Sequence, residues 1–476
     1  MTRGAAFFDL DRTLLAGASG AVFSQAMEHA GLTSGPIPGE KLLYGLFNRI
    51  GETLPSMLIA RQGPLAAKGR SSAAVREAAA TVVDQLIDLV QPFAEFALDE
   101  HREAGRPIVL ATTTPYDLVQ PFAEAMGFDD VVATRYSVDA DGNYDGELDG
   151  PFVWSAGKLT GIQTWADAHD VDLAESWAYS DSFYDAPMLD AVGHPVVVNP
   201  DPRMILLAAA RRWPTVNLDV SPGVVKVPVV DLELQELLGK LNRPSAYPYA
   251  RFDFQGLDRI PREGPCILVA NHRSYFDSAA VSVAISQVGR PARFLGKKEV
   301  FDAPVVGQLA TAMGGIRVDR ASGSDEPLQA AADALDGGEM VALMPEGTIP
   351  RGPAFFEPEL TGRWGAARLA QMTEAPVIPI GLWGTEKVWP RNRRVPNMLN
   401  VIDPPTVRLS VGLPVELKYR SLDKDTKRIM TAIVKQLPAE AKQRITPTRE
   451  QLLATFPPGY DGDPEAEVTR RPGTDT

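Results

Sequence analysis

Two groups of acidic, basic and hydroxyl side chains follow short buried-type apolar runs in this chain. The first group opens with Asp9 and Asp11, and the second opens with His272 and Asp277. Two carboxylates two residues apart can share a hard cation, whereas an imidazole oriented by a carboxylate can remove a proton from an alcohol. The sequence therefore predicts two reaction sites of unrelated chemistry.

The first group continues with a hydroxyl, a lysine and a second acidic pair. Thr112 ends the apolar run at 108–111, Lys158 follows Gly157, and Asp181 and Asp185 lie in one short segment. Such an inventory is what phosphoryl transfer through a carboxylate requires. One aspartate attacks phosphorus, Mg²⁺ neutralises charge, and the hydroxyl and lysine hold the phosphoryl oxygens.

Over about residues 5–205 these motifs resemble the haloacid dehalogenase-like phosphatases, in the phosphoserine phosphatase-like branch with a helical cap after the first motif. The resemblance implies Asp9 as nucleophile, Asp11 as general acid and base, and Thr112 and Lys158 as phosphate-binding residues. It implies Mg²⁺ held by Asp9, Asp181 and the backbone carbonyl of Asp11, with Asp185 supporting the phosphate site. Ser180 stands where the family usually has glycine.

His272 and Asp277 are five residues apart, which on a straight helix places them about 140° apart. They can meet only if His272 lies on the turn before a helix that contains Asp277. Asn271 and Ser274 are turn and cap formers, which favours this arrangement. Asp277 would then orient the imidazole, and the substrate would supply the hydroxyl.

Downstream of this pair lie a glycine turn followed by cations at 314–320 and a Pro-Glu-Gly-Thr segment at 345–348. Together with the pair they suggest acyl transfer to a phosphorylated alcohol. Over about residues 262–415 the sequence resembles the glycerolipid acyltransferases, which include 1-acylglycerol-3-phosphate acyltransferase. The resemblance implies His272 as general base oriented by Asp277.

The same resemblance implies an acceptor site and two substrates. Arg320, Glu346, Gly347 and Thr348 would bind the phosphate and glycerol of a lysophospholipid acceptor, and acyl-CoA or acyl carrier protein would be the donor. The cation that usually follows this motif is displaced to Arg351, which leaves the acceptor open. Arg320 could instead form a surface salt bridge.

Composition limits the partners and the compartment. The formal charge of −14 over 476 residues argues against nucleic acid as a partner. One cysteine, Cys266, excludes an internal disulfide and favours a reducing cytoplasm. An apolar signal segment and a spanning run of 18 or more apolar residues are both absent from the sequence, so a lipid substrate would be met at the membrane surface. We expect a cytoplasmic protein, with peripheral contact at the inner face of the cell membrane left open.

Alternation of apolar strands with helical patterns predicts an α/β fold in each half. We expect a Rossmann-like parallel sheet over 1–205 with a helical cap at about 17–104, and an α/β glycerolipid acyltransferase domain over 249–440. Residues 206–248 are predicted to be a linker with an amphipathic helix at 231–241, packed on protein or on membrane. Residues 441–476 are predicted to be a C-terminal segment that is disordered at its end, from about 456.

The sequence thus predicts a bifunctional enzyme of phospholipid metabolism and leaves three questions open. The phosphatase substrate could be a phospholipid or a soluble ester such as phosphoserine, and the N-terminal domain could instead be a regulatory phosphate-binding module. Lys297 and Lys298 could meet donor phosphates or be solvated. The basic segment at 389–394 could contact lipid or the phosphates of CoA, or be a solvated loop.

Overall fold

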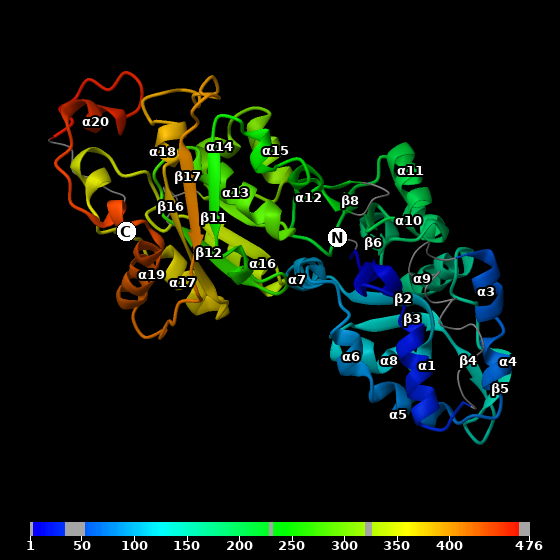
Figure 1. The fold of residues 1–476 in the computed structure, drawn as a ribbon. Helices are drawn as coiled ribbons and strands as arrows, with labels where there is room; N and C mark the ends of the chain where they lie inside the picture. The colour runs from blue at the N-terminus through cyan, green and yellow to red at the C-terminus, as the bar shows by residue number, and fades with distance from the viewer. Residues whose placement is uncertain (1–2, 34–52, 228–231, 319–325, 466–476) are drawn as a thin grey trace. The chain divides into compact units, whose positions relative to one another are not determined.

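The computed structural model describes residues 3–33, 53–227, 232–318 and 326–465. Contacts divide the chain into two units, Met1–Pro222 and Gly223–Thr476. Each unit has its own sheet and its own core (Figure 1). The predicted α/β class is confirmed for both.

Unit 1 is built on a six-stranded sheet in the order β3-β2-β1-β6-β7-β8, with every pairing parallel. Its strands are β1 (Ala6–Phe8), β2 (Ile108–Pro115), β3 (Asp130–Thr134), β6 (Trp177–Ser180), β7 (His194–Val198) and β8 (Thr215–Val216). Alternate residues of β1 face opposite cores, with Phe8 on one side and Phe7 on the other, as the two-residue period of a strand requires. Asp9 and Asp181 directly follow the carboxyl ends of β1 and β6, which are neighbours in the sheet.

Helices cover both faces of this sheet. The segment between β1 and β2 contains α1 (Gly20–His29), α3 (Leu54–Ala60), α4 (Gly63–Ala67), α5 (Ser72–Ala80), α6 (Val83–Ile87) and α7 (Ala94–Glu103). The remaining elements are α8 (Tyr116–Ala125), α9 (Ala156–Ala168), α10 (Ala186–Ala191), α11 (Pro202–Arg211) and the hairpin of β4 (Tyr136–Val138) and β5 (Tyr144–Leu148). The inserted helices pack on α8 and on the hairpin, beside one face of the sheet.

Unit 2 contains a seven-stranded sheet in the order β11-β17-β16-β12-β15-β13-β14. The strands are β11 (Arg251–Gln255), β12 (Cys266–Ala270), β13 (Arg293–Lys297), β14 (Ile316–Val318), β15 (Met340–Leu343), β16 (Val377–Trp383) and β17 (Thr406–Val411). Only the β16–β17 pairing is antiparallel. Figure 1 shows β11, β17 and β16 side by side.

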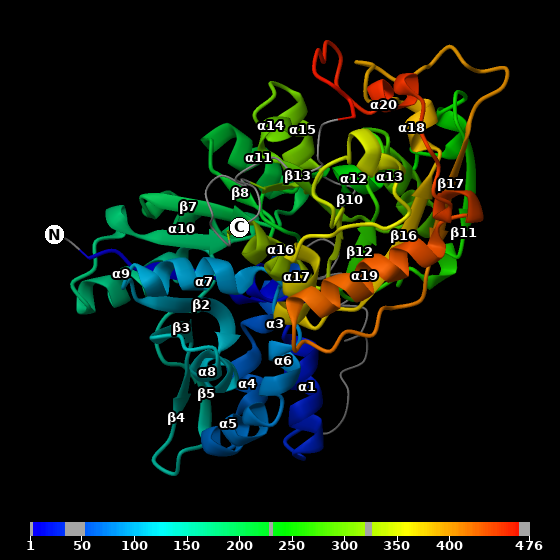
Figure 2. The ribbon, with the colours of Figure 1, turned by 90° about the vertical axis from the view of Figure 1, so that its left-hand side faces the viewer.

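The helices of unit 2 also lie on both faces of its sheet. They are α12 (Leu234–Gly239), α13 (Asp277–Val288), α14 (Lys298–Phe301), α15 (Val306–Ala312), α16 (Glu326–Asp336), α17 (Gly365–Thr373), α18 (Thr385–Val388), α19 (Leu422–Gln436) and α20 (Arg449–Ala454). The face bearing Leu268 packs on α13, and the face bearing Val269 packs on α16, α17 and α19, the last seen as the long orange helix in Figure 2.

The stretch predicted as a linker, 206–248, differs from the structure. Its first part completes α11 and β8 of unit 1, and its described remainder begins unit 2 with β9 (Lys226–Val227), β10 (Leu232–Glu233) and α12. The predicted helix at 231–241 is shorter, because Glu233 forms the N-cap and pairs with the buried guanidinium of Arg293 at 2.5 Å. Residue 231 lies outside the described residues.

The C-terminal segment also differs from the prediction. Phe456 is fully buried and stacks on Tyr460 with ring centroids 4.0 Å apart. A buried phenylalanine stacked on a partly buried tyrosine fixes the chain where composition alone favoured disorder. Residues 466–476 lie outside the described residues.

Candidate active sites

The first site begins where β1 ends. Asp9 is held at the strand end by its backbone N–H, which donates to the carbonyl of Tyr179 at 3.0 Å. The chain then turns sharply through residues 10–14, with Arg12 in the left-handed region at φ 63°. This turn points Thr13 back at the strand ends, where its hydroxyl lies 3.2 Å from Asp9 and 3.3 Å from Asp181.

Lys158 connects the nucleophile candidate with the second acidic pair. Its side chain is 1% exposed, and Nζ donates to Asp9 Oδ1 at 2.8 Å and to Asp185 Oδ2 at 2.6 Å. Ser180 Oγ donates to the same Asp185 oxygen at 2.7 Å. The structure therefore brings together three residues that lie far apart in the sequence, and Ser180 has a use that the sequence did not reveal.

Asp181 faces the same turn. Its backbone N–H donates to Thr13 Oγ1 at 3.0 Å, and its carboxylate pairs with Arg12 Nε at 3.1 Å. Sequence reasoning missed Arg12 and Thr13 as members of this cluster. Thr13 was visible as the last residue of the Asp-x-Asp-x-Thr motif.

Asp11 and Thr112 lie at the same edge but contact other groups. The Asp11 carboxylate accepts from the backbone N–H of Ser19 at 2.5 Å, so its side chain is directed at the first inserted helix. Burial raises its pKa, which suits a group that must carry a proton. Thr112 is buried within β2, two residues beyond Leu110, which pairs with the last residue of β1, and its hydroxyl accepts from the N–H of Thr114 at 3.1 Å.

Charge in this site is unbalanced. Four carboxylates gather with two cations, namely Asp9, Asp11, Asp181 and Asp185 with Lys158 and Arg12. Burial raises the pKa of Asp9 to about 6, Lys158 opposes the rise, and Asp185 and Asp11 add to it. An excess of buried carboxylate oxygen fits a hard divalent cation.

The described residues contain no cluster of three His, Cys, Asp or Glu side chains able to hold a metal ion. The predicted magnesium ligands need only two such side chains, Asp9 and Asp181, because Asp11 would contribute its backbone carbonyl. Thr13 bridges those two carboxylates, so the donor set and the charge fit the ion that the resemblance implies.

The second site is a turn between β12 and α13. His272 Nδ1 and Asp277 Oδ2 are 2.8 Å apart, and the same oxygen accepts from the backbone N–H groups of Arg273 and Ser274 at 2.5 and 2.7 Å. Asp277 is fully buried as the first residue of α13, whereas the His272 side chain is 18% exposed. The carboxylate therefore receives Nδ1–H and leaves Nε2 to accept a proton from a substrate.

Glu346 supports the backbone of this turn. Its Oε2 accepts from the His272 N–H at 2.5 Å, and burial raises the pKa of Glu346 to about 8. Gly347 follows at φ 70°, a conformation that favours glycine. Glu346 thus contacts the backbone of the dyad histidine, and the predicted contact of Glu346, Gly347 and Thr348 with the acceptor stays a prediction.

Two further residues fix the turn. Asn271 exchanges two hydrogen bonds with the backbone of Leu382, at 2.9 and 2.7 Å. Arg273 pairs with Glu386 and lies over the rings of Phe355 and Trp383, each 4.2 Å from the guanidinium carbon. The sequence marked Asn271 only as a turn former and did not indicate Arg273, because both act through residues about 80 to 110 positions away.

Arg320 lies outside the described residues, so its predicted contact with the acceptor stays a prediction. Arg317, in the same cationic segment, pairs with Asp302 at 3.2 Å.

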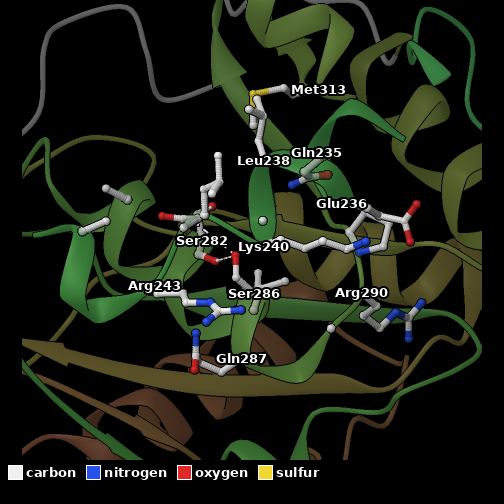
Figure 3. A pocket seen from close by; sticks show the side chains of 18 of the residues that line it. Gln235, Glu236, Leu238, Lys240, Arg243, Ser282, Ser286, Gln287, Arg290 and Met313 are labelled. Atoms are coloured by element: carbon white, nitrogen blue, oxygen red, sulfur yellow. Dashed lines mark hydrogen bonds between the residues drawn. The ribbon is translucent and has the colours of Figure 1, made fainter. Parts of the chain in front are cut away.

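A pocket of about 700 Å³ lies between α12 and α13 (Figure 3). Lys240, Arg243 and Arg290 line it together with Leu238 and Met313. The lining residues do not include His272 or Asp277. This hollow is therefore separate from the dyad.

Comparison with known proteins agrees with the division into two units. The pattern of the haloacid dehalogenase-like hydrolase family matches residues 6–190, and that of the acyltransferase family matches residues 251–383. An inhibition of morphological differentiation protein from Streptomyces azureus is 34% identical over 220 residues, covering 46% of this chain and 79% of that protein.

Two other relatives have named activities. Phosphoserine phosphatase SerB1 of Mycobacterium tuberculosis is 30% identical over 230 residues, covering 47% of this chain and 74% of that protein. The chloroplastic 1-acyl-sn-glycerol-3-phosphate acyltransferase BAT2 of Brassica napus is 31% identical over 153 residues, covering 31% of this chain and 41% of that protein.

The chain belongs to the haloacid dehalogenase-like hydrolases and carries an acyltransferase domain after that unit. It is a bifunctional enzyme that combines a phosphatase with an O-acyltransferase related to the 1-acylglycerol-3-phosphate acyltransferases. Among the residues described, no helix is long and apolar enough to cross a bilayer.

Proposed function

We propose that unit 2 transfers an acyl chain from acyl-CoA or acyl carrier protein to 1-acylglycerol-3-phosphate, giving phosphatidate. The observation that carries this proposal is the His272–Asp277 contact of 2.8 Å, with the imidazole partly exposed and the carboxylate buried. The relative from Brassica napus, whose name states this activity, supports the choice of acceptor.

The proposed reaction needs only one base. Nε2 of His272 takes the proton from the acceptor hydroxyl as its oxygen attacks the thioester carbonyl. The C–S bond breaks, and the departing thiolate receives the proton from the imidazolium. Asp277 stabilises the imidazolium throughout. Arg320, Glu346, Gly347 and Thr348 remain the candidates for holding the acceptor, with Glu346 acting also through the His272 backbone.

Unit 1 we propose to be a phosphomonoesterase that passes through a phosphorylated Asp9. Asp9 attacks phosphorus, Asp11 protonates the leaving alcohol and then removes a proton from water, and Thr112 and Lys158 hold the phosphoryl oxygens. Mg²⁺, when bound by Asp9, Asp181 and the Asp11 carbonyl, would neutralise the charge of nucleophile and phosphate. Asp185 positions Lys158 through their 2.6 Å contact.

Two substrate classes compete for unit 1. If the substrate is phosphatidate, the two units catalyse consecutive reactions, because unit 1 dephosphorylates the product of unit 2. A soluble ester such as phosphoserine is supported by the named relative from Mycobacterium tuberculosis. Phosphate release from phosphatidate vesicles and from phosphoserine, measured side by side, separates the two classes.

Reciprocal substitutions test the two-site proposal. Asp9→Asn should abolish phosphate release and leave acyl transfer intact, and His272→Ala should do the reverse. Phosphate release that survives in Asp9→Asn would exclude the covalent mechanism. If the wild-type protein forms no acylated product from lysophosphatidate with either donor, lysophosphatidate is excluded as the acceptor. We propose a cytoplasmic location, with the acyltransferase unit meeting its lipid acceptor at the inner face of the cell membrane.

A further inference from the structure

The segment between α18 and β17 exposes an unusual set of side chains. Residues 395–402, here called the apolar loop, carry five large apolar side chains that are each more than half exposed: Val395, Met398, Leu399, Val401 and Ile402. Leu399 is 91% exposed and Ile402 is 96% exposed. In Figure 2 the chain between α18 and β17 leaves the body of unit 2 as a long orange excursion. A contiguous apolar projection of this kind marks an interaction surface.

Basic residues precede the apolar loop. Arg393 and Arg394 are exposed, Arg391 lies just before them, and no acidic residue occurs from 389 to 402. The chain as a whole has a formal charge of −14, so the positive charge of this segment is opposite in sign to that of the whole chain. Apolar side chains next to arginines suit a bilayer with anionic headgroups, where hydrocarbon receives the former and phosphate the latter.

The base of the segment is fixed to the turn that carries the dyad. Trp389 accepts through its carbonyl from Ser274 Oγ at 2.7 Å, and its ring lies 5.6 Å from that of Tyr275. Its indole N–H donates to the Arg393 carbonyl at 3.0 Å, and the N–H of Asn397 donates to the Val388 carbonyl at 3.0 Å. A surface bound by the apolar loop would therefore lie near His272.

We propose that the apolar loop inserts into the surface of a bilayer that contains anionic lipid, with Arg393 and Arg394 at the headgroups. The proposed function gives a reason for this contact, since a lysophospholipid acceptor resides in the bilayer. An acidic carrier protein could also meet the arginines. Five projecting aliphatic and thioether side chains favour hydrocarbon over a polar protein surface.

Flotation of the full chain with vesicles tests the apolar part of the proposal. With vesicles of phosphatidylcholine and roughly a third phosphatidylglycerol, the wild type should bind, and L399S/I402S should bind about 10-fold more weakly or worse. Leu413→Ser is the matched control, because Leu413 is 70% exposed at the opposite end of β17 and should change nothing. Equal binding by wild type and L399S/I402S would overturn the proposal.

The charged part has its own control. R393Q/R394Q should weaken binding to the anionic vesicles by about 10- to 30-fold. K424Q/K427Q, which removes two exposed lysines from α19, should leave binding unchanged. A loss as large with K424Q/K427Q as with R393Q/R394Q would assign the binding to general charge and overturn the role of the loop.

Depth is measured with a fluorophore. The single cysteine, Cys266, is fully buried, so Leu399→Cys can be labelled selectively, with Leu413→Cys as the control. With vesicles, the emission maximum of a fluorophore at position 399 should shift to shorter wavelength, and nitroxide-labelled lipid should quench this emission. A fluorophore at position 413 should show neither change. Emission from position 399 that neither shifts nor is quenched in the presence of vesicles would overturn insertion. Loop variants that keep vesicle binding but lose binding to acyl carrier protein would also overturn it. Neither measurement uses turnover, so a failed acylation assay leaves the result intact.

Discussion

Asp277→Asn isolates the charge of the dyad carboxylate from its geometry. Asp277 Oδ2 accepts from His272 Nδ1 and from two backbone N–H groups, whereas Oδ1 is buried and has no hydrogen-bond partner among the described residues. In the variant, the amide oxygen can take the place of Oδ2 and keep all three bonds. The amide nitrogen then takes the place of the unpartnered oxygen, so the main change is loss of the negative charge.

The size of the effect follows from the distance. With Nδ1 and Oδ2 at 2.8 Å, the centres of charge of imidazolium and carboxylate lie about 4 Å apart. At an effective dielectric constant of about 20 their attraction is about 4 kcal/mol. The imidazolium forms as the acceptor loses its proton, so this attraction belongs to the transition state. Its loss should lower the acyl-transfer rate about 1,000-fold.

Release of CoA from acyl-CoA with lysophosphatidate measures this rate through a thiol reagent. Cys266 contributes little background, because burial raises the pKa of its thiol to about 11. Asp425→Asn is the matched control, since Asp425 is also buried and accepts from the backbone N–H groups of Lys418 and Tyr419. A fall of less than about 10-fold in Asp277→Asn, or an equal fall in Asp425→Asn, would refute the electrostatic role.

Three other predictions follow from buried charge. Lys158→Gln leaves Asp9 and Asp185 facing each other unpaired, so phosphate release should fall at least about 100-fold while acyl transfer is kept; retained phosphatase activity would contradict its role. Chelation with EDTA should abolish phosphate release, restored by Mg²⁺, and spare acyl transfer; loss of both activities would contradict separate sites. Burial raises the pKa of Glu346 from 4.5 to about 8, so the folded state binds this proton more tightly and loses up to about 5 kcal/mol of stability as pH rises between those values. Glu346→Gln should remove that dependence, measured as denaturation midpoints of the acyltransferase unit from acidic to alkaline pH; a difference between variant and wild type that is constant with pH would contradict it.

Much of each site could be predicted because its residues follow strand ends. Parallel strands bring their carboxyl ends to one edge, so an aspartate after β1 and another after β6 had to approach each other. The structure places Asp9 and Asp181 on either side of Thr13, as expected from that rule. The dyad was predictable for a different reason, since a five-residue spacing excludes a shared helix face and leaves only a turn.

Contacts between distant segments could not be predicted in this way. No local pattern pairs Asn271 with Leu382 or Arg273 with Glu386, because such pairs are set by sheet order rather than by spacing. The predicted length of α12 was wrong for a similar reason. Its leucine spacing predicts a longer helix, but Glu233 is drawn into an ion pair with Arg293, which lies on another strand. A tertiary ion pair thus overrode a local propensity.

In both sites a buried aspartate holds a functional side chain, the ammonium of Lys158 or the imidazole of His272, and accepts hydrogen bonds through only one of its oxygens. Asp185 Oδ2 receives Lys158 and Ser180, and Asp277 Oδ2 receives His272, while each Oδ1 is buried with no hydrogen-bond partner in the part of the chain that the structure describes. A carboxylate hydrogen-bonded on both oxygens would spread its charge over more donors. Concentrating the protein donors on one oxygen fixes the side chain in a single orientation and keeps its negative charge next to the lysine or the imidazole. The two chemistries are unrelated, yet each depends on a carboxylate that contacts the working lysine or imidazole. Substitution of Asp277 should therefore lower kcat of acyl transfer and leave KM for the acceptor unchanged, whereas substitution of Asp185 should also weaken phosphate binding, because Asp185 positions the lysine proposed to hold the phosphoryl oxygens.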